Sequence, residues 1–98
     1  MEVVISKSAR AGKKYQATAS TGKTVHFGAE GYSDFTKGAS YERRERYISR
    51  HKKNEDWSKA NLMSAGFMAR HVLWEEPTVR GAVQKLNQKY KHVKFTLR

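Results

Sequence analysis

Short runs in which apolar and polar residues alternate mark the beginning and the end of the chain. Val3–Ile5 is a β-branched run, and residues 14–19 and 24–28 alternate with a period of two, so we expect three short strands. Gly22 lies between the second and third of these, where its freedom to adopt a positive φ suits a tight hairpin. Residues 93–97 alternate in the same way, which predicts a fourth strand that joins the N-terminal sheet.

The middle of the chain carries helical signals. Residues 40–53 predict a helix that begins at a Ser40 cap, although its apolar stripe is thin. Its only inward face is formed by Arg44, Tyr47, Ile48 and His51. Residues 61–74 are so rich in apolar side chains that they predict the most buried helix. Pro77 fits the first turn of a third helix that ends near Tyr90 and has one apolar face.

The predicted element order is therefore β-β-β-α-α-α-β, which indicates an α+β fold. We expect one small basic domain, residues 1–98, with a small antiparallel sheet packed against about three helices. The N-terminal β-hairpin strands and the C-terminal strand would form this sheet. A glycine-punctuated loop before the first helix carries Tyr32 and Phe35, whose rings we expect over the core.

Charge adds a functional signal to this fold. The chain has 20 Lys and Arg against 9 Asp and Glu, a formal charge of +11, which attracts polyanions or acidic protein surfaces. Cysteine is absent, which excludes disulfides and thiolate metal sites. The first residues contain an apolar run too short for a signal peptide or a bilayer span, so we expect neither.

Motifs for chemistry are weak. Residues 21–24 match the end of a phosphate-binding loop, but Ala17 replaces its first glycine and the segment joins two strands, so we interpret it as a hairpin turn. The four histidines are scattered, and we expect no metal, no cofactor and no catalytic activity. The enzymatic alternative is an unfamiliar site around His26, Glu30, Tyr32 and Asp34.

The densest cationic segment is residues 41–57, which combines arginines and lysines with tyrosines and a tryptophan. Arginine binds carboxylate or phosphate bidentately, whereas base-specific reading would favour Asn or Gln, and the basic helix within this segment has neither before Asn54. The alternative is a solvated face with pairs such as Glu42–Arg46. The candidate residues for binding a partner or polyanion are Lys23, Arg43, Arg44, Arg46, Arg50, His51, Lys52, Lys53 and Trp57.

Three blocks of the sequence occur together: GKTVHFGAEGYSDFT (22–36), ERRERYISRHKKNEDWSK (42–59) and AGFMARHVLWEEPTVRGAV (65–83). Taken together, they resemble a family of small basic proteins from nucleocytoplasmic large DNA viruses. The third block departs from the family pattern at Met68 and His71, where that pattern has additional tryptophans.

The resemblance implies a virion structural protein without catalytic activity, a minor capsid or cement component of an icosahedral capsid. Such a protein is made in the cytoplasm or nucleus of the host cell. Its expected partners are the major capsid protein or other minor capsid proteins, with DNA or an anionic inner membrane surface as further candidates and no small-molecule substrate. The alternative is a packaging or accessory protein that binds nucleic acid without sequence specificity.

Overall fold

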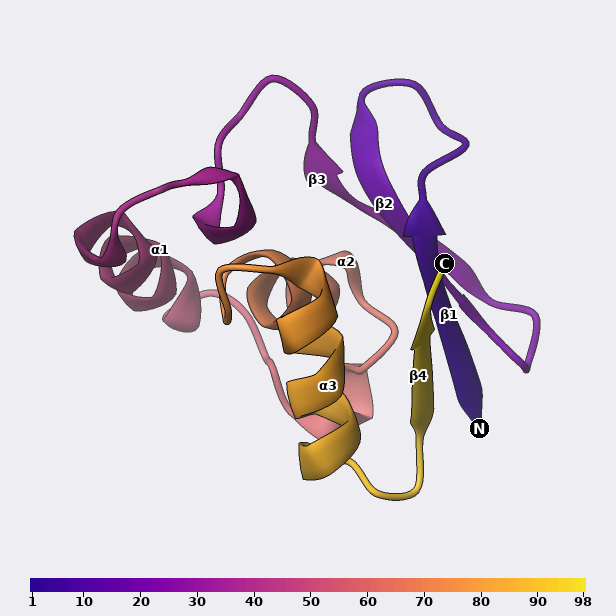
Figure 1. Cartoon of the computed structure of the whole chain (residues 1–98). Coiled ribbons are helices and arrows are strands. Elements are labelled where there is room, and N and C mark those ends of the chain that lie inside the picture. Colours follow the sequence, from indigo (N-terminus) through magenta and orange to yellow (C-terminus); the bar gives the residue numbers. More distant parts are fainter.

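The computed structural model describes all 98 residues and has the predicted α+β architecture. Its elements in order are β1 (Glu2–Lys7), β2 (Lys13–Ala19), β3 (Thr24–Ala29), the 3-10 turn η1 (Phe35–Lys37), α1 (Tyr41–Lys52), the 3-10 turn η2 (Lys59–Asn61), α2 (Ala65–Met68), the π-helical segment η3 (Ala69–Leu73), α3 (Val79–Lys89) and β4 (Lys94–Leu97). The helices gather on one side of the sheet, and both termini lie at the sheet (Figure 1).

The sheet is mixed, with strand order β3-β2-β1-β4. The three N-terminal strands form an antiparallel meander, and Gly22 has a φ of 99° in the β2–β3 turn, as predicted. β4 joins β1 in parallel, with Val3 opposite Phe95, so the prediction of a wholly antiparallel sheet is wrong for this pair. The alternation of residues 93–97 defines which side chains face the core, but both strand directions satisfy that alternation.

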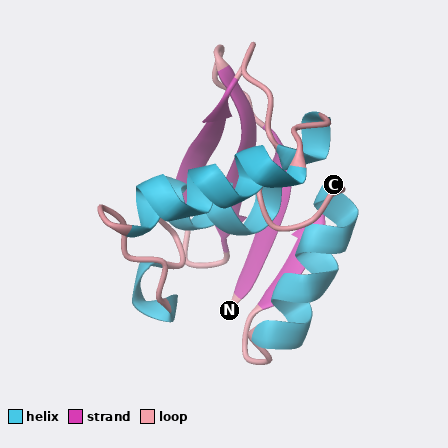
Figure 2. Cartoon of the chain, turned by 90° about the vertical axis from the view of Figure 1, so that its left-hand side faces the viewer, coloured by secondary structure: helices cyan, strands magenta, loops and turns pink.

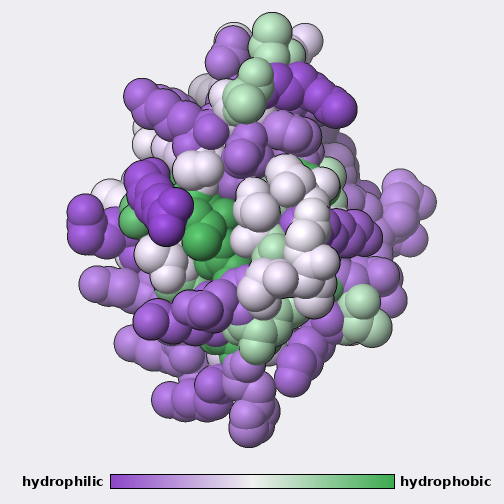
Figure 3. All heavy atoms as spheres, turned by 90° about the vertical axis from the view of Figure 1, so that its right-hand side faces the viewer, coloured by the Kyte–Doolittle hydropathy of each residue, from purple (hydrophilic) through white to green (hydrophobic).

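The core lies between the sheet and the helices. Val3 and Ile5 are fully buried, whereas Val4 and Ser6 on the opposite face are only half-buried, which is the period-two pattern of a sheet covered on one face. The uncovered face shows a small apolar area rimmed by hydrophilic side chains (Figure 3). The helical side supplies Leu62, Phe67, Met68, Val72, Leu73, Trp74, Val83 and Leu86.

Helix α1 forms the outermost layer and runs across the strands (Figure 2). The Ser40 Oγ accepts a hydrogen bond from the Arg43 amide at 3.2 Å, which is the predicted cap. Its half-buried residues are the four predicted to face inward, and all other residues of α1 are exposed. Because these four side chains are mostly polar, α1 is attached by specific polar and aromatic contacts.

The other two helices begin later than predicted. The Ser64 Oγ accepts a hydrogen bond from the Phe67 amide at 3.1 Å and starts α2, which continues into η3, so this helix is shorter than 61–74 but strongly buried. The Thr78 Oγ1 accepts a hydrogen bond from the Gly81 amide at 3.0 Å and caps α3, which begins at Val79. Pro77 therefore precedes the helix and does not lie in its first turn. No helix is long and apolar enough to cross a membrane.

The glycine-punctuated loop between β3 and α1 places only one of its two aromatic rings over the core. Phe35 is half-buried and packs against the core, as expected. Tyr32 is 74% exposed and does not cover the core. The loop turns outward at Gly31, where φ is 87°, and this turn leaves the Tyr32 side chain at the surface.

Candidate functional site on the cationic face of helix α1

Most cationic side chains have no carboxylate partner. Of the 20 Lys and Arg, four form ion pairs: Lys14, Arg44, Arg70 and Lys85. The other sixteen make no ion pair within the chain, so their charge is available to an external partner.

Four of the predicted binding residues line one side of α1. Arg43, Arg46, Arg50 and Lys53 are exposed, and their spacing of three, four and three residues places them in one row along about 15 Å of helix axis. We call this row the cation stripe. Lys52 is also exposed but lies on another side of the helix.

Arg44, one of the predicted partner-binding residues, is engaged within the fold. Its side chain is 13% exposed, and its guanidinium donates to the Glu75 carbonyl at 3.3 Å and the Glu75 carboxylate at 3.5 Å. The same guanidinium lies 5.6 Å from the Phe35 ring centre and 5.7 Å from that of Tyr41. Arg44 therefore fixes α1 to the chain segment that leads into α3.

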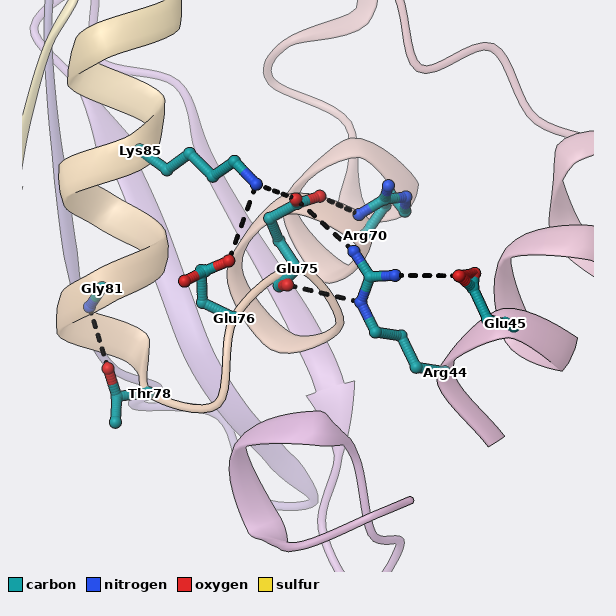
Figure 4. A network of polar contacts seen from close by, with 8 residues as sticks. All are labelled: Arg44, Glu45, Arg70, Glu75, Glu76, Thr78, Gly81 and Lys85. Atoms are coloured by element: carbon teal, nitrogen blue, oxygen red, sulfur yellow. Dashed lines mark hydrogen bonds and ion pairs between the residues drawn. The ribbon is translucent and has the colours of Figure 1, made fainter. Parts of the chain in front are cut away.

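Glu75 is the centre of an ion-pair cluster that also includes α3 (Figure 4). Arg70 and Lys85 each approach its carboxylate at 2.5 Å, and Lys85 also lies 3.6 Å from Glu76. Burial alone would raise the pKa of Glu75, but the hydrogen bonds and charges of Lys85 and Arg70 outweigh it and hold that pKa at about 2. This cluster joins α1, η3 and α3, and no pattern in the sequence predicts it, because its members are brought together only by the fold.

His51 and Glu55 join the end of α1 to α2. The His51 Nδ1 lies 2.9 Å from the Glu55 carboxylate, and the imidazole packs against the Tyr47 ring at 4.2 Å. A Cβ at Gly66 would lie 1.9 Å from a Glu55 oxygen, so glycine in α2 makes room for this carboxylate. His51 thus supports the helix and is only partly available to a partner.

Trp57 and Lys23 lie away from the cation stripe. Trp57 is half-buried beneath Arg70, whose guanidinium is 5.5 Å from the ring, and its indole nitrogen is buried without a hydrogen-bond partner. Lys23 is exposed at the β2–β3 turn. This turn and α1 lie at opposite sides of the molecule (Figure 1). The structure therefore brings together only part of the predicted set.

A groove adjoins the cation stripe. It has a volume of about 480 Å³, and we call it the Tyr32 groove. Its lining comprises Lys7, Lys14, Tyr15, Glu30, Gly31, Tyr32, Ser33 and Lys37. A second hollow of about 260 Å³ shares Lys14, Tyr32 and Ser33 with it and extends to Arg43. Because Arg43 also donates to the Ser33 Oγ at 2.6 Å, it connects the groove to the stripe.

A buried ion pair holds the groove in shape. The Lys14 Nζ contacts the Asp34 carboxylate and the Tyr32 carbonyl, both at 2.5 Å. Asp34 is 2% exposed and also accepts a hydrogen bond from the Thr36 amide at 2.8 Å. The loop that carries Tyr32 is therefore fixed by its backbone, while the ring remains exposed.

The residues of the enzymatic alternative do not converge. The His26 Nδ1 lies 2.7 Å from the Ser8 Oγ, and Asp34 is occupied by Lys14. Glu30 and Tyr32 line the groove, but His26 does not. No cluster of three or more histidine or acidic side chains is arranged to hold a metal ion.

These features define a small α+β domain with an unneutralised cationic face and an adjoining groove. The chain belongs to a family of unknown function (DUF5754), which matches residues 3–51, half of the chain. No curated protein matches the sequence. No solved structure matches it either. The matched residues run from β1 almost to the end of α1 and include the whole lining of the Tyr32 groove.

Proposed function

We propose that this chain is a non-catalytic structural protein that binds an acidic neighbouring protein through the cation stripe. The observation that carries the proposal is the row of four exposed cations, none of which has a carboxylate partner in the chain. Arginine pairs with carboxylates through two parallel hydrogen bonds, and a row of such side chains suits an acidic protein surface.

The attachment of α1 supports this role because a binding helix gains affinity when it is held in place before the partner arrives. Tyr47 stacks on Trp74 with ring centres 4.4 Å apart and an angle of 7° between the planes. Arg44 binds Glu75 on the same side of the helix. Both contacts lie opposite or beside the stripe, so they fix the helix and leave the stripe open.

We further propose that the assembly is the capsid of a large icosahedral DNA virus, in which the protein is a minor capsid or cement component. This part rests on the three sequence blocks that resemble small basic proteins of such viruses. The second block contains almost the whole of α1. If α1 clamps acidic capsid subunits together, the acidic groups of those subunits neutralise the unpaired cations of this helix.

The test is zero-length crosslinking of purified particles with a carbodiimide, followed by mass spectrometry. Carbodiimide joins lysine to carboxylate, so we expect Lys53 to be coupled to Asp or Glu of a capsid protein. The double variant Arg46→Glu, Arg50→Glu should lose incorporation into particles, whereas Arg80→Glu, an exposed residue of α3, should incorporate normally. Normal incorporation of the double variant, or absence of the protein from particles, would contradict the proposal.

A further inference from the structure

Tyr32 is an exposed aromatic ring with no partner in the chain. The large apolar or aromatic side chains that are exposed are Met1, Tyr32 and Tyr41, at 48%, 74% and 61%. The Tyr41 ring has the Arg44 guanidinium 5.7 Å away, whereas Tyr32 takes part in no aromatic pair and no cation–π contact. The exposed ring is thus available for stacking on a planar group from outside the chain.

The backbone that carries this ring is held in place, although the ring itself is exposed. Lys14 holds the Tyr32 carbonyl, and the Tyr32 amide donates to the Ala29 carbonyl at 3.4 Å. Because this backbone is already ordered, the entropy lost when a planar group stacks on the ring is limited to that of the Tyr32 side chain.

The charges around the ring favour an anion. Lys7 and Lys37 line the Tyr32 groove without an ion pair, and Arg43 lies in the adjoining hollow. Asp34 neutralises Lys14, so the carboxylate that opposes these three cations is that of Glu30. The volume of about 480 Å³ falls within the range of about 300–1,000 Å³ typical of ligand sites.

We propose that the Tyr32 groove binds single-stranded nucleic acid, with one base stacked on Tyr32 and the flanking phosphates on Lys7, Lys37 and Arg43. Cationic grooves that combine phosphate contacts with a stacking ring are the usual means of binding single strands without sequence preference. A duplex keeps its bases paired and stacked inside, so it cannot offer one to the ring. An acidic protein could also use the cations, so the contact that distinguishes a nucleic acid from it is the stacking of a base on Tyr32.

This site shares only Arg43 with the cation stripe, so the two proposals can be tested separately at the other residues. Lys7, Tyr32 and Lys37 lie outside the cation stripe, and Arg46 and Arg50 lie outside the groove. A variant of the groove therefore tests nucleic-acid binding, and the double variant Arg46→Glu, Arg50→Glu tests binding of the protein neighbour. Either proposal can fail while the other holds.

The experiment measures fluorescence anisotropy of a labelled oligothymidine of about twelve nucleotides with the full chain. We expect Tyr32→Ala to weaken binding about 5- to 100-fold and Tyr32→Trp to retain it, because stacking carries this part of the affinity. Tyr41→Ala, which removes another exposed ring, should bind like the wild type. Lys37→Gln should reduce the slope of log affinity against log salt by about 0.7, the value for one phosphate of a single strand.

Any of three results would overturn the proposal. If Tyr32→Ala binds oligothymidine as tightly as the wild type while circular dichroism shows both to be folded, the groove takes no base. If a hairpin duplex binds more tightly, or polyglutamate displaces the oligonucleotide equally well from the wild type and from Tyr32→Ala, the groove is a general anion or acidic-protein surface.

Discussion

The side-chain amide of Asn87 makes both backbone hydrogen bonds of Phe95 at the free edge of β4. The Asn87 Oδ1 accepts from the Phe95 amide at 2.8 Å, and the Asn87 Nδ2 donates to the Phe95 carbonyl at 2.9 Å. β4 has β1 as its neighbour on one side only, and open strand edges pair readily with other chains. Asn87 therefore replaces a neighbouring strand at this position and ties α3 to the sheet.

Replacing Asn87 with alanine should lower the free energy of unfolding by about 1–3 kcal/mol, because the amide and carbonyl of the buried Phe95 lose their partners. Urea denaturation measures this loss. Gln88→Ala, one position along α3 and exposed, is the control and should change stability by less than about 0.5 kcal/mol. Equal stabilities of the two variants would show that Asn87 contributes nothing at the edge.

Gly28 and Gly22 both have a positive φ, but only Gly28 is closely surrounded. A Cβ at Gly22 would have no atom within 4 Å. Gly22→Ala should therefore lower the free energy of unfolding by about 1 kcal/mol, through backbone strain alone. At Gly28 the Cβ would lie 2.7 Å from the Cδ1 of buried Leu73, and the loss should reach about 2–4 kcal/mol. Thermal and urea unfolding of both variants would check the order, and a Gly28→Ala variant as stable as Gly22→Ala would contradict it.

The Glu75 cluster should be a major source of tertiary stability. Glu75→Gln removes the negative charge with which Arg44, Arg70 and Lys85 all pair. We therefore expect the free energy of unfolding to fall by about 2–3 kcal/mol. Glu76→Gln alters a more exposed carboxylate with one distant ion pair and should cost less than about 0.5 kcal/mol. Urea unfolding at neutral pH gives both values. Similar stabilities would mean that the cluster is solvated in solution.

Most of the fold could be predicted from the sequence, because each element carries its own periodicity or cap. The β2–β3 hairpin and the inward face of α1 follow from alternation, from Gly22 and from Ser40. The direction of β4 could not be predicted, since parallel and antiparallel pairing place Phe95 on the same face. It depends on the end of the sheet to which α3 returns the chain.

One part of the candidate site could be predicted from the sequence, and the other part depends on the tertiary structure. The row of Arg43, Arg46 and Arg50 follows from helical spacing, so the sequence contains it. The Tyr32 groove is non-local: Lys7 faces Tyr15 because β1 pairs with β2, and Tyr32 is held by Lys14 from a distant part of the chain. Arg44 lay in the cationic segment, but only the tertiary structure shows that Glu75 binds it.

His71 makes stability depend on pH between neutrality and pH 5. It is 9% exposed, packs on Phe67 with ring centres 4.4 Å apart, and has its pKa lowered to about 4 by burial, with smaller contributions from the charges of Arg70 and Lys89. As pH falls below 6.5, the unfolded chain takes up a proton at this imidazole that the folded chain does not, so stability decreases towards the folded pKa.

The free energy of unfolding should fall by about 1–2 kcal/mol between pH 7 and pH 5, since one pKa unit corresponds to about 1.4 kcal/mol. Glu75 contributes little over this range, because both its pKa of about 2 in the fold and its ordinary value of 4.5 lie below pH 5. Urea unfolding across the range should show the loss in the wild type and in His92→Gln, whose histidine is exposed, but not in His71→Gln. A His71→Gln variant that keeps the full pH dependence would assign it to another group and show that the imidazole of His71 takes up its proton without opposing the fold.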